Sequence, residues 1–215
     1  MKMKDIIIVC DDSFGLDVKG MVLAINKYHY ENDGLIPYNL KGFVGSENMS
    51  DKIKRMFSPY LGDYEKWIPS NKEVYAMGIV NPFRKKNAVE KLKVQGAIFE
   101  TLRAPWVLAH LDFEFPEGCI IAAQSVMDSA KIGRFVTLYH SMVGFDAVVD
   151  DYASVMAFSN ITTAHIGEQA YIDNNVVIIG KTVNAMAIVK PNSVVVKEVK
   201  EGITVSGNPA RKVKQ

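Results

Sequence analysis

Residues 161–178 read ITTAHIGEQAYIDNNVVI, a stretch in which isoleucine returns about every six residues. The same spacing runs through the second half of the chain, where fourteen positions are all Ile, Leu or Val. In order, they are Ile120, Val126, Ile132, Leu138, Val143, Val149, Val155, Ile161, Ile166, Ile172, Ile178, Val183, Val189 and Val195. The phase slips by one residue three times. A hexapeptide period of this kind predicts a parallel β-helix.

Small residues occupy a second fixed position in this repeat, two residues before the aliphatic one. They are Ala130, Ala147, Ala153, Ser159, Ala164, Ala170, Ala187 and Ser193. Each hexapeptide is expected to form a short strand and a turn, and three of them complete one triangular coil. We expect the aliphatic side chain to point into the prism and the small residue to fit a tight corner, with coils stacked at roughly 4.8 Å.

The first half of the chain alternates between apolar strands and amphipathic helices. Strands are expected at residues 5–10, 42–45, 73–79 and 97–99, and helices around 18–25 and at 84–94, with a long loop or short-helix insertion at 46–72. Strands that alternate with helices predict a small parallel α/β sheet.

The composition is that of an ordinary globular protein. The chain has 215 residues, of which 48% are hydrophobic and 23% charged, and its net charge is +1. This balance excludes disorder and gives no global positive field for nucleic acid or an anionic membrane. Cys10 and Cys119 are far apart, which excludes a disulfide framework and a cysteine-based zinc site and suits a reducing, cytoplasmic location. No histidine pair has the i, i+4 spacing of a metal site, and the apolar run at residues 6–10 is too short for a signal peptide or a membrane span.

The chain resembles the bacterial sugar acetyltransferases that modify sialic acid or amino-sugar nucleotides in surface-glycan synthesis, which are hexapeptide-repeat acyltransferases with a left-handed β-helix. The resemblance covers nearly the whole chain. It rests on Ala76-Met77-Gly78 with Arg84, on the hexapeptides from 120 to 195, and on the stretch VSGNPAR at residues 205–211. That last stretch resembles the usual exit from the β-helix in this superfamily.

The repeat and the resemblance together predict an α/β, Rossmann-like N-terminal domain followed by an all-β left-handed parallel β-helix. We expect the first domain to cover residues 1–106, the β-helix residues 107–197 and a C-terminal tail residues 198–215. Solenoids need capped ends. We expect the first domain and the tail to supply the caps.

The resemblance implies a homotrimer that uses acetyl-CoA as co-substrate, has active sites between neighbouring prisms, and acts on a sugar or nucleotide-linked sugar. The N-terminal domain of such enzymes holds the nucleotide-linked sugar, and the matching positions here are Asp12, Ser13, Phe14, Gly15, Gly78 and Arg84. The family has a glycine-rich turn after the first strand, and only Gly15 fits that pattern. Asp11 and Asp12 would repel a diphosphate, whereas an Asp can still bind a ribose or sugar hydroxyl.

Acetyl transfer from a thioester needs a base that takes the proton from the attacking hydroxyl or ammonium group, and imidazole is the usual one. In the family this base is a His followed by an acidic residue, and the matching positions here are Phe145 and Asp146. Phe145 cannot accept a proton. We predict that His140 carries it instead, because His140 follows Leu138 at the offset that Phe145 has after Val143. Asp146 would then orient the acceptor amine or a water molecule.

The other histidines leave alternatives open. His140 lies one prism corner before Phe145, and five extended residues span up to roughly 17 Å. It can therefore replace Phe145 only where corners of different chains meet at a trimer interface. His165 precedes inward-pointing Ile166 and should point outward, toward a neighbour or groove, which makes it the second candidate for the base. We expect Phe145 and His165 to line the acceptor pocket. His29 is expected at the surface and His110 in a structural position.

We expect acetyl-CoA to lie in the groove between prisms and to contact Ser154, Asn174, Gly180 and Lys190, without a metal ion. Basic residues near the C-terminus could meet the phosphates of CoA or form a solvated face. They are Lys190, Lys197, Arg211, Lys212 and Lys214.

Two functions remain open at this point. The favoured one is an acetyl-CoA-dependent sugar acetyltransferase. The rival is a diverged, trimeric binding or scaffold protein that kept the fold after losing its base. Phe145 and the glycine-poor turn favour the rival, whereas the hexapeptides report fold and not function.

Overall fold

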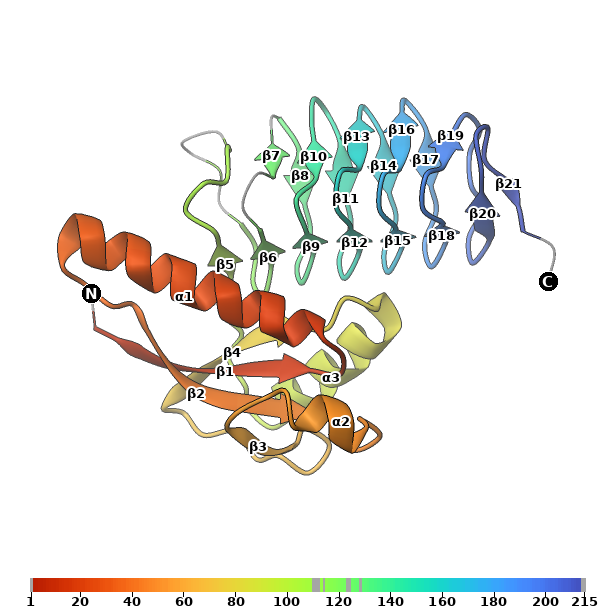
Figure 1. The fold of residues 1–215 in the computed structure, drawn as a ribbon. Coiled ribbons are helices and arrows are strands. Elements are labelled where there is room, and N and C mark those ends of the chain that lie inside the picture. The colour runs from red at the N-terminus through yellow and green to blue at the C-terminus, as the bar shows by residue number, and fades with distance from the viewer. Residues whose placement is uncertain (1, 110–112, 114, 123–124, 128, 214–215) are drawn as a thin grey trace. The chain divides into compact units, whose positions relative to one another are not determined.

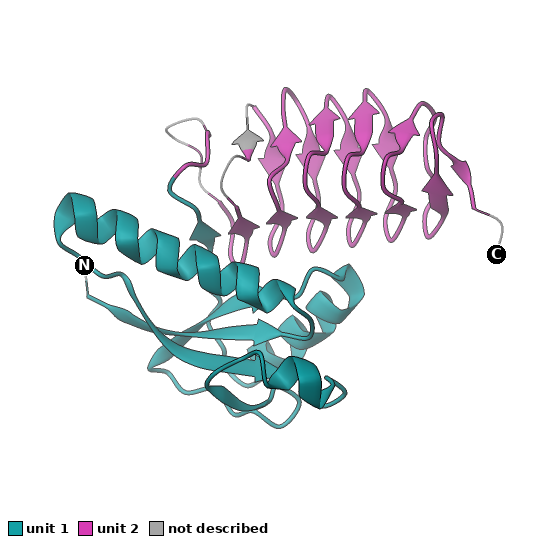
Figure 2. Cartoon of the chain, in the orientation of Figure 1, with its two compact units in different colours: residues 1–105 teal, residues 106–215 magenta. Residues whose placement is uncertain are grey.

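The computed structural model describes residues 2–109, 113, 115–122, 125–127 and 129–213. The chain forms two compact units, residues 1–105 and residues 106–215 (Figures 1 and 2). The first unit is a parallel α/β sheet and the second is a parallel β-helix, so the predicted fold class is confirmed.

The first unit is built on a four-stranded parallel sheet with the order β3-β2-β1-β4. Its elements are β1 (Lys4–Cys10), α1 (Phe14–Asp33), β2 (Tyr38–Gly45), α2 (Asp51–Lys54), β3 (Tyr60–Asp63), β4 (Glu73–Gly78), α3 (Pro82–Val94) and the short β5 (Leu102–Arg103). The core strand is β1, whose side chains from Ile6 to Cys10 are all buried. A strand paired on both sides and covered by helices needs such a continuous apolar run.

Two details of this unit differ from the sequence-based expectation. Residues 46–72 contain the short helix α2, which was one of the two expected possibilities, and also an edge strand, β3, which was not expected. Residues 97–99 contribute only an isolated bridge, in which Phe99 pairs with Tyr75 of the edge strand β4. The fourth strand of the sheet is therefore β3 and not the segment at 97–99.

The second unit stacks short parallel strands into three faces, visible as successive coils in Figure 1. The first face contains β7 (Val126–Met127), β10 (Met142–Val143), β13 (Asn160–Thr162), β16 (Val177–Ile179) and β19 (Val194–Val195). The second face contains β8 (Lys131–Ile132), β11 (Val148–Val149), β14 (His165–Ile166) and β17 (Thr182–Val183). The third face contains β6 (Ile120–Ile121), β9 (Thr137–Leu138), β12 (Ser154–Val155), β15 (Tyr171–Ile172), β18 (Ile188–Val189), β20 (Thr204–Ser206) and β21 (Arg211–Lys212).

The register of the third face explains the slips of phase in the sequence. Leu138, Val155, Ile172 and Val189 stack on one another, each 17 residues after the last. A 17-residue coil consists of two six-residue sides and one five-residue side. The slip of one residue is therefore a regular property of this β-helix.

The predicted phase is wrong at the first two aliphatic positions. The ladder pairs Ile121, and not Ile120, with the inward-facing Leu138. It likewise pairs Met127, and not Val126, with Val143. The error arose because both Ile120 and Ile121 are apolar, so hydrophobicity alone does not choose between them. From Ile132 onward the predicted phase agrees with the register.

The corners explain the second position of the repeat. All eight small residues predicted to fit tight corners are buried, from Ala130 to Ser193. The residue directly before each of them takes a left-handed backbone conformation, as at Asp146 (φ 51°), Thr163 (φ 50°) and Gln169 (φ 56°). A left-handed residue turns the chain sharply, and a small neighbour leaves room for the next coil.

The corner that contains Phe145 is one residue longer than the same corner of the next coil. Val149 comes six residues after Val143, whereas Ile166 comes five residues after Ile161. The preceding corner, which contains His140, is correspondingly short, because Val143 comes five residues after Leu138. Phe145 lies in this longer corner and is 58% exposed.

The β-helix continues past residue 197. Val205 on β20 stacks on Val189 of β18, and β21 then returns antiparallel to β20. Among the helices within the described residues, none is long and apolar enough to span a membrane.

We predict that the stacking of coils makes Gly167 costly to replace, whereas Gly144 can be replaced at little cost. A Cβ added at Gly167 would lie 2.5 Å from the backbone nitrogen of Ala185, whereas one added at Gly144 meets only the Thr162 hydroxyl at 3.6 Å. Both glycines directly follow an inward aliphatic residue, so they form a matched pair. Gly167→Ala should lower the free energy of unfolding by roughly 1–3 kcal/mol, and Gly144→Ala should change it by less than about 0.5 kcal/mol. Denaturant unfolding measures both, and equal effects would contradict the stacking argument.

Candidate active site

The structure brings one histidine and one carboxylate together on the second face of the β-helix. His165 lies on β14 directly before the inward Ile166, so its side chain points outward. Asp150 follows β11 on the coil before. The His165 Nε2 lies 2.7 Å from Asp150 Oδ2, and the two side chains are 49% and 41% exposed.

This contact fixes what the imidazole can do. When Nε2 carries its proton and donates to Asp150, the lone pair of His165 is on Nδ1. A carboxylate that holds an imidazole in one tautomer, and stabilises its cation, is the arrangement found in general-base pairs. The pair can therefore accept a proton from a group that approaches Nδ1 from solvent.

The pair lies close to the Phe145 corner along the coil. The Thr163 N–H donates to the Phe145 carbonyl oxygen at 2.8 Å, and His165 follows Thr163 by two residues. Phe145 and His165 thus belong to neighbouring coils at the edge between the first and second faces. His165 is exposed, which agrees with the predicted outward direction of its side chain, and Phe145 is exposed as well.

The structure does not bring His140 and Asp146 together within the chain. His140 precedes β10 at the corner between the third and first faces, whereas Asp146 follows β10 at the opposite corner. The His140 ring packs edge-on against Tyr139, with ring centroids 4.5 Å apart. A role for His140 as the base therefore stays a prediction that requires a second chain.

One other histidine is also paired with a carboxylate, but it lies on a helix of the first unit. His29 Nδ1 lies 3.1 Å from Asp33 Oδ2, one turn along the exposed side of α1. His110 lies outside the described residues. Within the part of the chain that the structure describes, no group of three His, Cys, Asp or Glu side chains is arranged to hold a metal ion.

The residues predicted to contact acetyl-CoA do not form a single cluster. Ser154 lies on the third face and is fully buried, so its hydroxyl is not exposed. Asn174 and Lys190 lie on neighbouring coils where the third face ends, and the Asn174 side chain accepts the Ala157 N–H at 3.1 Å. Gly180 lies at the corner between the first and second faces and takes φ 61°. Asn174, Gly180 and Lys190 therefore lie at two different corners of the prism.

A second group of polar residues lies in the first unit, at the carboxyl ends of β1 and β4. After β1 the chain forms β2, which lies next to β1 on one side within the sheet. It later returns to form β4, which lies next to β1 on its other side. Such a switch point between adjacent parallel strands is where open α/β sheets bind ligands. Asp11 and Asp12 follow β1, and Arg84 lies in the first turn of α3 after β4.

Each residue predicted for this turn has a definite place. Asp12 Oδ1 accepts the Phe14 N–H at 2.9 Å and so starts α1, whereas the Ser13 side chain makes no capping bond. The Phe14 side chain is buried. A Cβ at Gly15 would lie 2.6 Å from the Cβ of Cys10, and one at Gly78 would lie 2.9 Å from the Val9 carbonyl oxygen. These two glycines therefore let the helix and the strand approach closely.

Asp11 is the unusual group of this site. Its side chain is 2% exposed, and neither carboxyl oxygen has a hydrogen-bond partner among the described residues. The Arg84 guanidinium pairs with it at 3.1 Å and also approaches Asp12 at 3.6 Å. Burial raises the pKa of Asp11 to about 7, with Arg84 lowering it and the Asp12 carboxylate raising it. The carboxyl is thus partly neutral near neutral pH.

The pairing of Asp150 with His165 and the burial of Asp11 were not predicted from the sequence. The two residues differ in whether a sequence pattern could have indicated them. Because Val149 and Ile166 stack, Val148 lies opposite His165 and Asp150 lies diagonally across from it, which the repeat alone could have shown. Asp11 follows a buried strand, but its burial depends on α1 packing over the sheet. That packing is a tertiary property with no sequence pattern of its own.

No family model and no curated protein matches this chain. Solved structures match it over almost its whole length. The acetyltransferase domain of PglB from Neisseria gonorrhoeae is 15% identical with a TM-score of 0.80, covering 98% of this chain and 100% of that chain. A mutant GDP-perosamine N-acetyltransferase from Caulobacter crescentus, in complex with CoA and GDP-perosamine, is 15% identical with a TM-score of 0.79, covering 100% and 99%.

WeeI from Acinetobacter baumannii AYE is 23% identical with a TM-score of 0.75, covering 98% of this chain and 100% of that chain. At these identities the likeness is one of fold. This chain shares the two-unit fold, an α/β sheet followed by a parallel β-helix, with sugar N-acetyltransferases.

Proposed function

We propose that this protein is an acetyl-CoA-dependent acetyltransferase that acts on an amino or hydroxyl group of a sugar, in the form of a nucleotide-linked sugar. The observation that carries this proposal is the His165–Asp150 pair, a hydrogen-bonded imidazole and carboxylate exposed on a β-helix. The fold it shares with structures solved with acetyl-CoA, or with CoA and a nucleotide sugar, supports these ligand classes.

The proposed reaction is direct attack of the acceptor on the thioester. The acceptor nitrogen or oxygen forms a bond to the acetyl carbonyl carbon, and the carbon–sulfur bond of the thioester breaks. His165 Nδ1 takes the proton that the acceptor loses and returns it to the departing thiolate. Asp150 stabilises the imidazolium formed in between, and backbone N–H groups stabilise the negative charge on the carbonyl oxygen.

The first unit would hold the nucleotide-linked part of the acceptor. Arg84 is half exposed at the switch point and can pair with a phosphate, while Asp12 can accept a hydrogen bond from a ribose or sugar hydroxyl. A fully ionised Asp11 would oppose a diphosphate. Because burial keeps Asp11 partly protonated near neutral pH, this repulsion is reduced.

The first face of the β-helix supports the expected self-association. Its exposed side chains include Met142, Ile179 and Val196, and a shallow hollow of about 210 Å³ lies among Val177, Ile179, Lys181, Val194, Val195 and Val196. A flat apolar face of a prism is buried most simply by closed symmetric packing. We therefore propose that the protein is a trimer, with this face at its interface.

We predict that His165 and not His140 is the base. His165→Asn should lower the rate of acetyl transfer to nucleotide-linked amino sugars by roughly 10²–10⁴-fold, as loss of a general base does. Asp150→Asn should lower it less, because His165 keeps its lone pair while the imidazolium loses the carboxylate that stabilises it. His29→Asn is the matched control, since it breaks the exposed His29–Asp33 pair and should leave the rate unchanged.

Two other results would contradict a role for His165 as the base, and they can be told apart. If His140→Asn abolishes transfer while His165→Asn does not, the base predicted from the sequence is correct. If the wild-type protein transfers nothing and Phe145→His creates activity, the rival binding-protein function is correct, because that substitution restores an imidazole beside Asp146.

We predict that Asp11 lowers stability above neutral pH. An unfolded Asp titrates near pH 4, so between about pH 4 and pH 7 the folded state binds more protons than the unfolded state, and stability falls as pH rises through this window. Asp11→Asn should therefore raise the free energy of unfolding by about 2 kcal/mol at pH 8 and by clearly less at pH 5. The control is Glu31→Gln on the exposed side of α1, which should have little effect at either pH. If Asp11→Asn raised the free energy of unfolding equally at both pH values, the raised pKa of Asp11 would be contradicted.

We predict a sedimentation mass of three times the chain mass of 23.9 kDa at micromolar concentration. The double variant Ile179→Lys with Val196→Lys should sediment as a monomer, because it places two charges on the first face. Val94→Lys replaces an even more exposed apolar side chain, on α3, and should leave the mass unchanged. A wild-type protein that sediments at the mass of one chain would rule out the trimer.

A further inference from the structure

The buried carboxyl group of Asp11 shares its cation with a second carboxyl group. Its side chain is 2% exposed, and Arg84 Nη1 lies 3.1 Å from Asp11 Oδ2. Arg84 Nη2 lies 3.6 Å from Asp12 Oδ2. When both carboxyl groups are ionised, the cluster therefore carries more negative than positive charge. Asp12 is more exposed and also accepts the Phe14 N–H, so Asp12 keeps its charge more readily and Asp11 is the group that titrates.

The other titratable groups that face Asp11 are acids that stay neutral. Cys10 precedes it at the end of β1, where burial above all, and then the neighbouring carboxylates, raise the pKa of the thiol. Tyr64 follows β3, and burial first, with a contribution from Asp11, raises its pKa to about 12. Among the described residues, Arg84 on α3 is the cation that lowers the pKa of Asp11. The ionised form of Asp11 thus depends on this one guanidinium.

Arg84 is also the part of the cluster that solvent can reach. Its side chain is 53% exposed, whereas both carboxyl oxygens of Asp11 are buried without a hydrogen-bond partner among the described residues. An anion that arrives from solvent binds the guanidinium, and its negative charge then lies close to Asp11. Whether the guanidinium turns toward the anion or stays between the two, the ionised form of Asp11 loses electrostatic stabilisation. Its buried oxygens gain no water in exchange, so protonation is favoured.

We propose that the binding of an anion at Arg84 is coupled to the uptake of a proton by Asp11, so that the affinity of this site falls as pH rises above neutrality. The inference rests on the proposed function only in placing an anionic ligand at Arg84. Asp11 then acts as a positioning residue, which holds the guanidinium while the site is empty and becomes neutral when the ligand arrives. The proton completes the neutralisation that Arg84 provides only in part.

The direction of the pH dependence follows from linkage. In the free protein the pKa of Asp11 is about 7, so below this pH the carboxyl group already holds its proton and binding takes up little. Above this pH the proton must be taken from solvent, and each whole proton weakens binding about tenfold per pH unit. An ion pair that served the fold alone would not link proton uptake to a ligand.

Calorimetric titration of the full chain with inorganic sulfate tests the coupling, because the charge of sulfate is constant between about pH 6 and pH 9. At constant ionic strength, the Kd should rise roughly tenfold from pH 6 to pH 8. Titrations in buffers of different ionisation enthalpy should report an uptake of more than about half a proton per chain at pH 8. Asp11→Asn should bind sulfate about equally at both pH values, and therefore roughly tenfold tighter than the wild type at pH 8.

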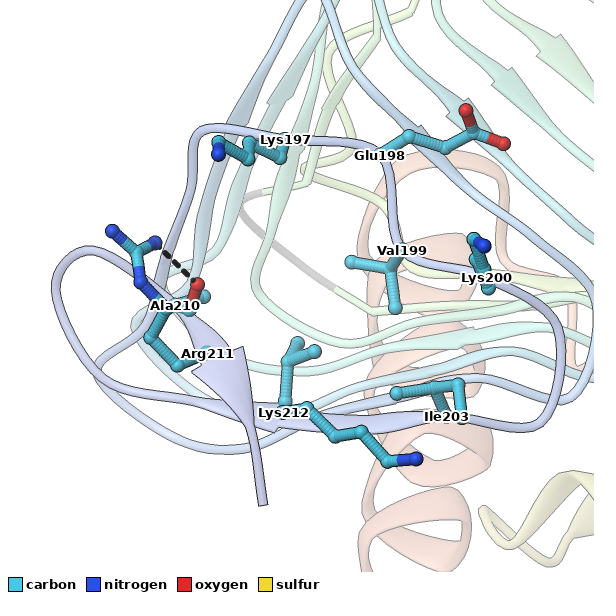
Figure 3. Close-up of a pocket in the computed structure, with 9 residues that line it drawn as sticks. Lys197, Glu198, Val199, Lys200, Ile203, Ala210, Arg211 and Lys212 are labelled. Atoms are coloured by element: carbon cyan, nitrogen blue, oxygen red, sulfur yellow. Dashed lines mark hydrogen bonds between the residues drawn. The ribbon is translucent and has the colours of Figure 1, made fainter. Parts of the chain in front are cut away.

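Two further variants serve as controls. Sulfate can also bind at the end of the last coil, where basic side chains surround a hollow of about 430 Å³ (Figure 3), namely Lys197, Lys200, Arg211 and Lys212. The double variant Asp11→Asn with Arg84→Gln measures such binding elsewhere, because it removes the guanidinium without leaving a buried carboxylate unpaired. Glu31→Gln removes an exposed negative charge on α1 and should keep the pH dependence of the wild type.

The proposal is overturned if the double variant binds sulfate as well as the wild type does, because the anion then does not use Arg84. It is equally overturned if binding takes up no proton at pH 8, or if Asp11→Asn keeps the pH dependence of the wild type. None of these measurements involves acetyl-CoA or a sugar. Proton-coupled binding in a protein that transfers no acetyl group would therefore contradict the proposed function alone.

Discussion

The structure of the second unit depends on one constraint: aliphatic side chains must stack in columns inside a narrow prism while the backbone of each coil pairs with the next. The columns are filled by residues such as Leu138, Val155 and Ile172, all of them fully buried. Burial of these columns supplies the hydrophobic stabilisation, and the parallel ladders satisfy the backbone of the strands. Everything outside the columns is then free to vary, provided that the corners can turn. This is why a protein only 15% identical to this chain can share its fold.

The same constraint sets how much could be predicted from the sequence. The column positions are nearly all Ile, Leu or Val, so the period, the fold class and the inward residues from Ile132 onward follow from the pattern alone. At Ile120 and Ile121 two adjacent apolar residues hide the phase, and only the ladder to Leu138 resolves it. In the first unit the strand β3 was missed because its residues, Tyr60 to Asp63, are all half-buried at an edge and carry no continuous apolar run.

In the candidate sites too, some features follow from the local sequence pattern, whereas others depend on tertiary packing. The outward direction of His165 followed from its position before Ile166, whereas its partner was found only when neighbouring coils were aligned. Asp11 illustrates the other case, because a carboxyl group with two oxygens lacking hydrogen bonds lowers stability unless something offsets the loss of water. Its ion pair with the half-exposed Arg84 is a partial offset that a bound ligand could complete. In the proposed function, this offset is completed when the ligand binds at the switch point.

The ladder also explains how a base could move within this fold without a change of architecture. In a stacked coil, a residue two positions further along the neighbouring strand is a diagonal neighbour, so an imidazole and a carboxylate 15 residues apart meet as readily as adjacent residues do. The Phe145 corner is one residue longer than the same corner of the next coil, and its exposed aromatic ring has no group that can exchange a proton. His165 on the next coil opens onto the same edge and already has its carboxylate. A shift of the proton-transfer role by one coil therefore needs only side-chain substitutions, since the backbone that positions both residues is the ladder itself.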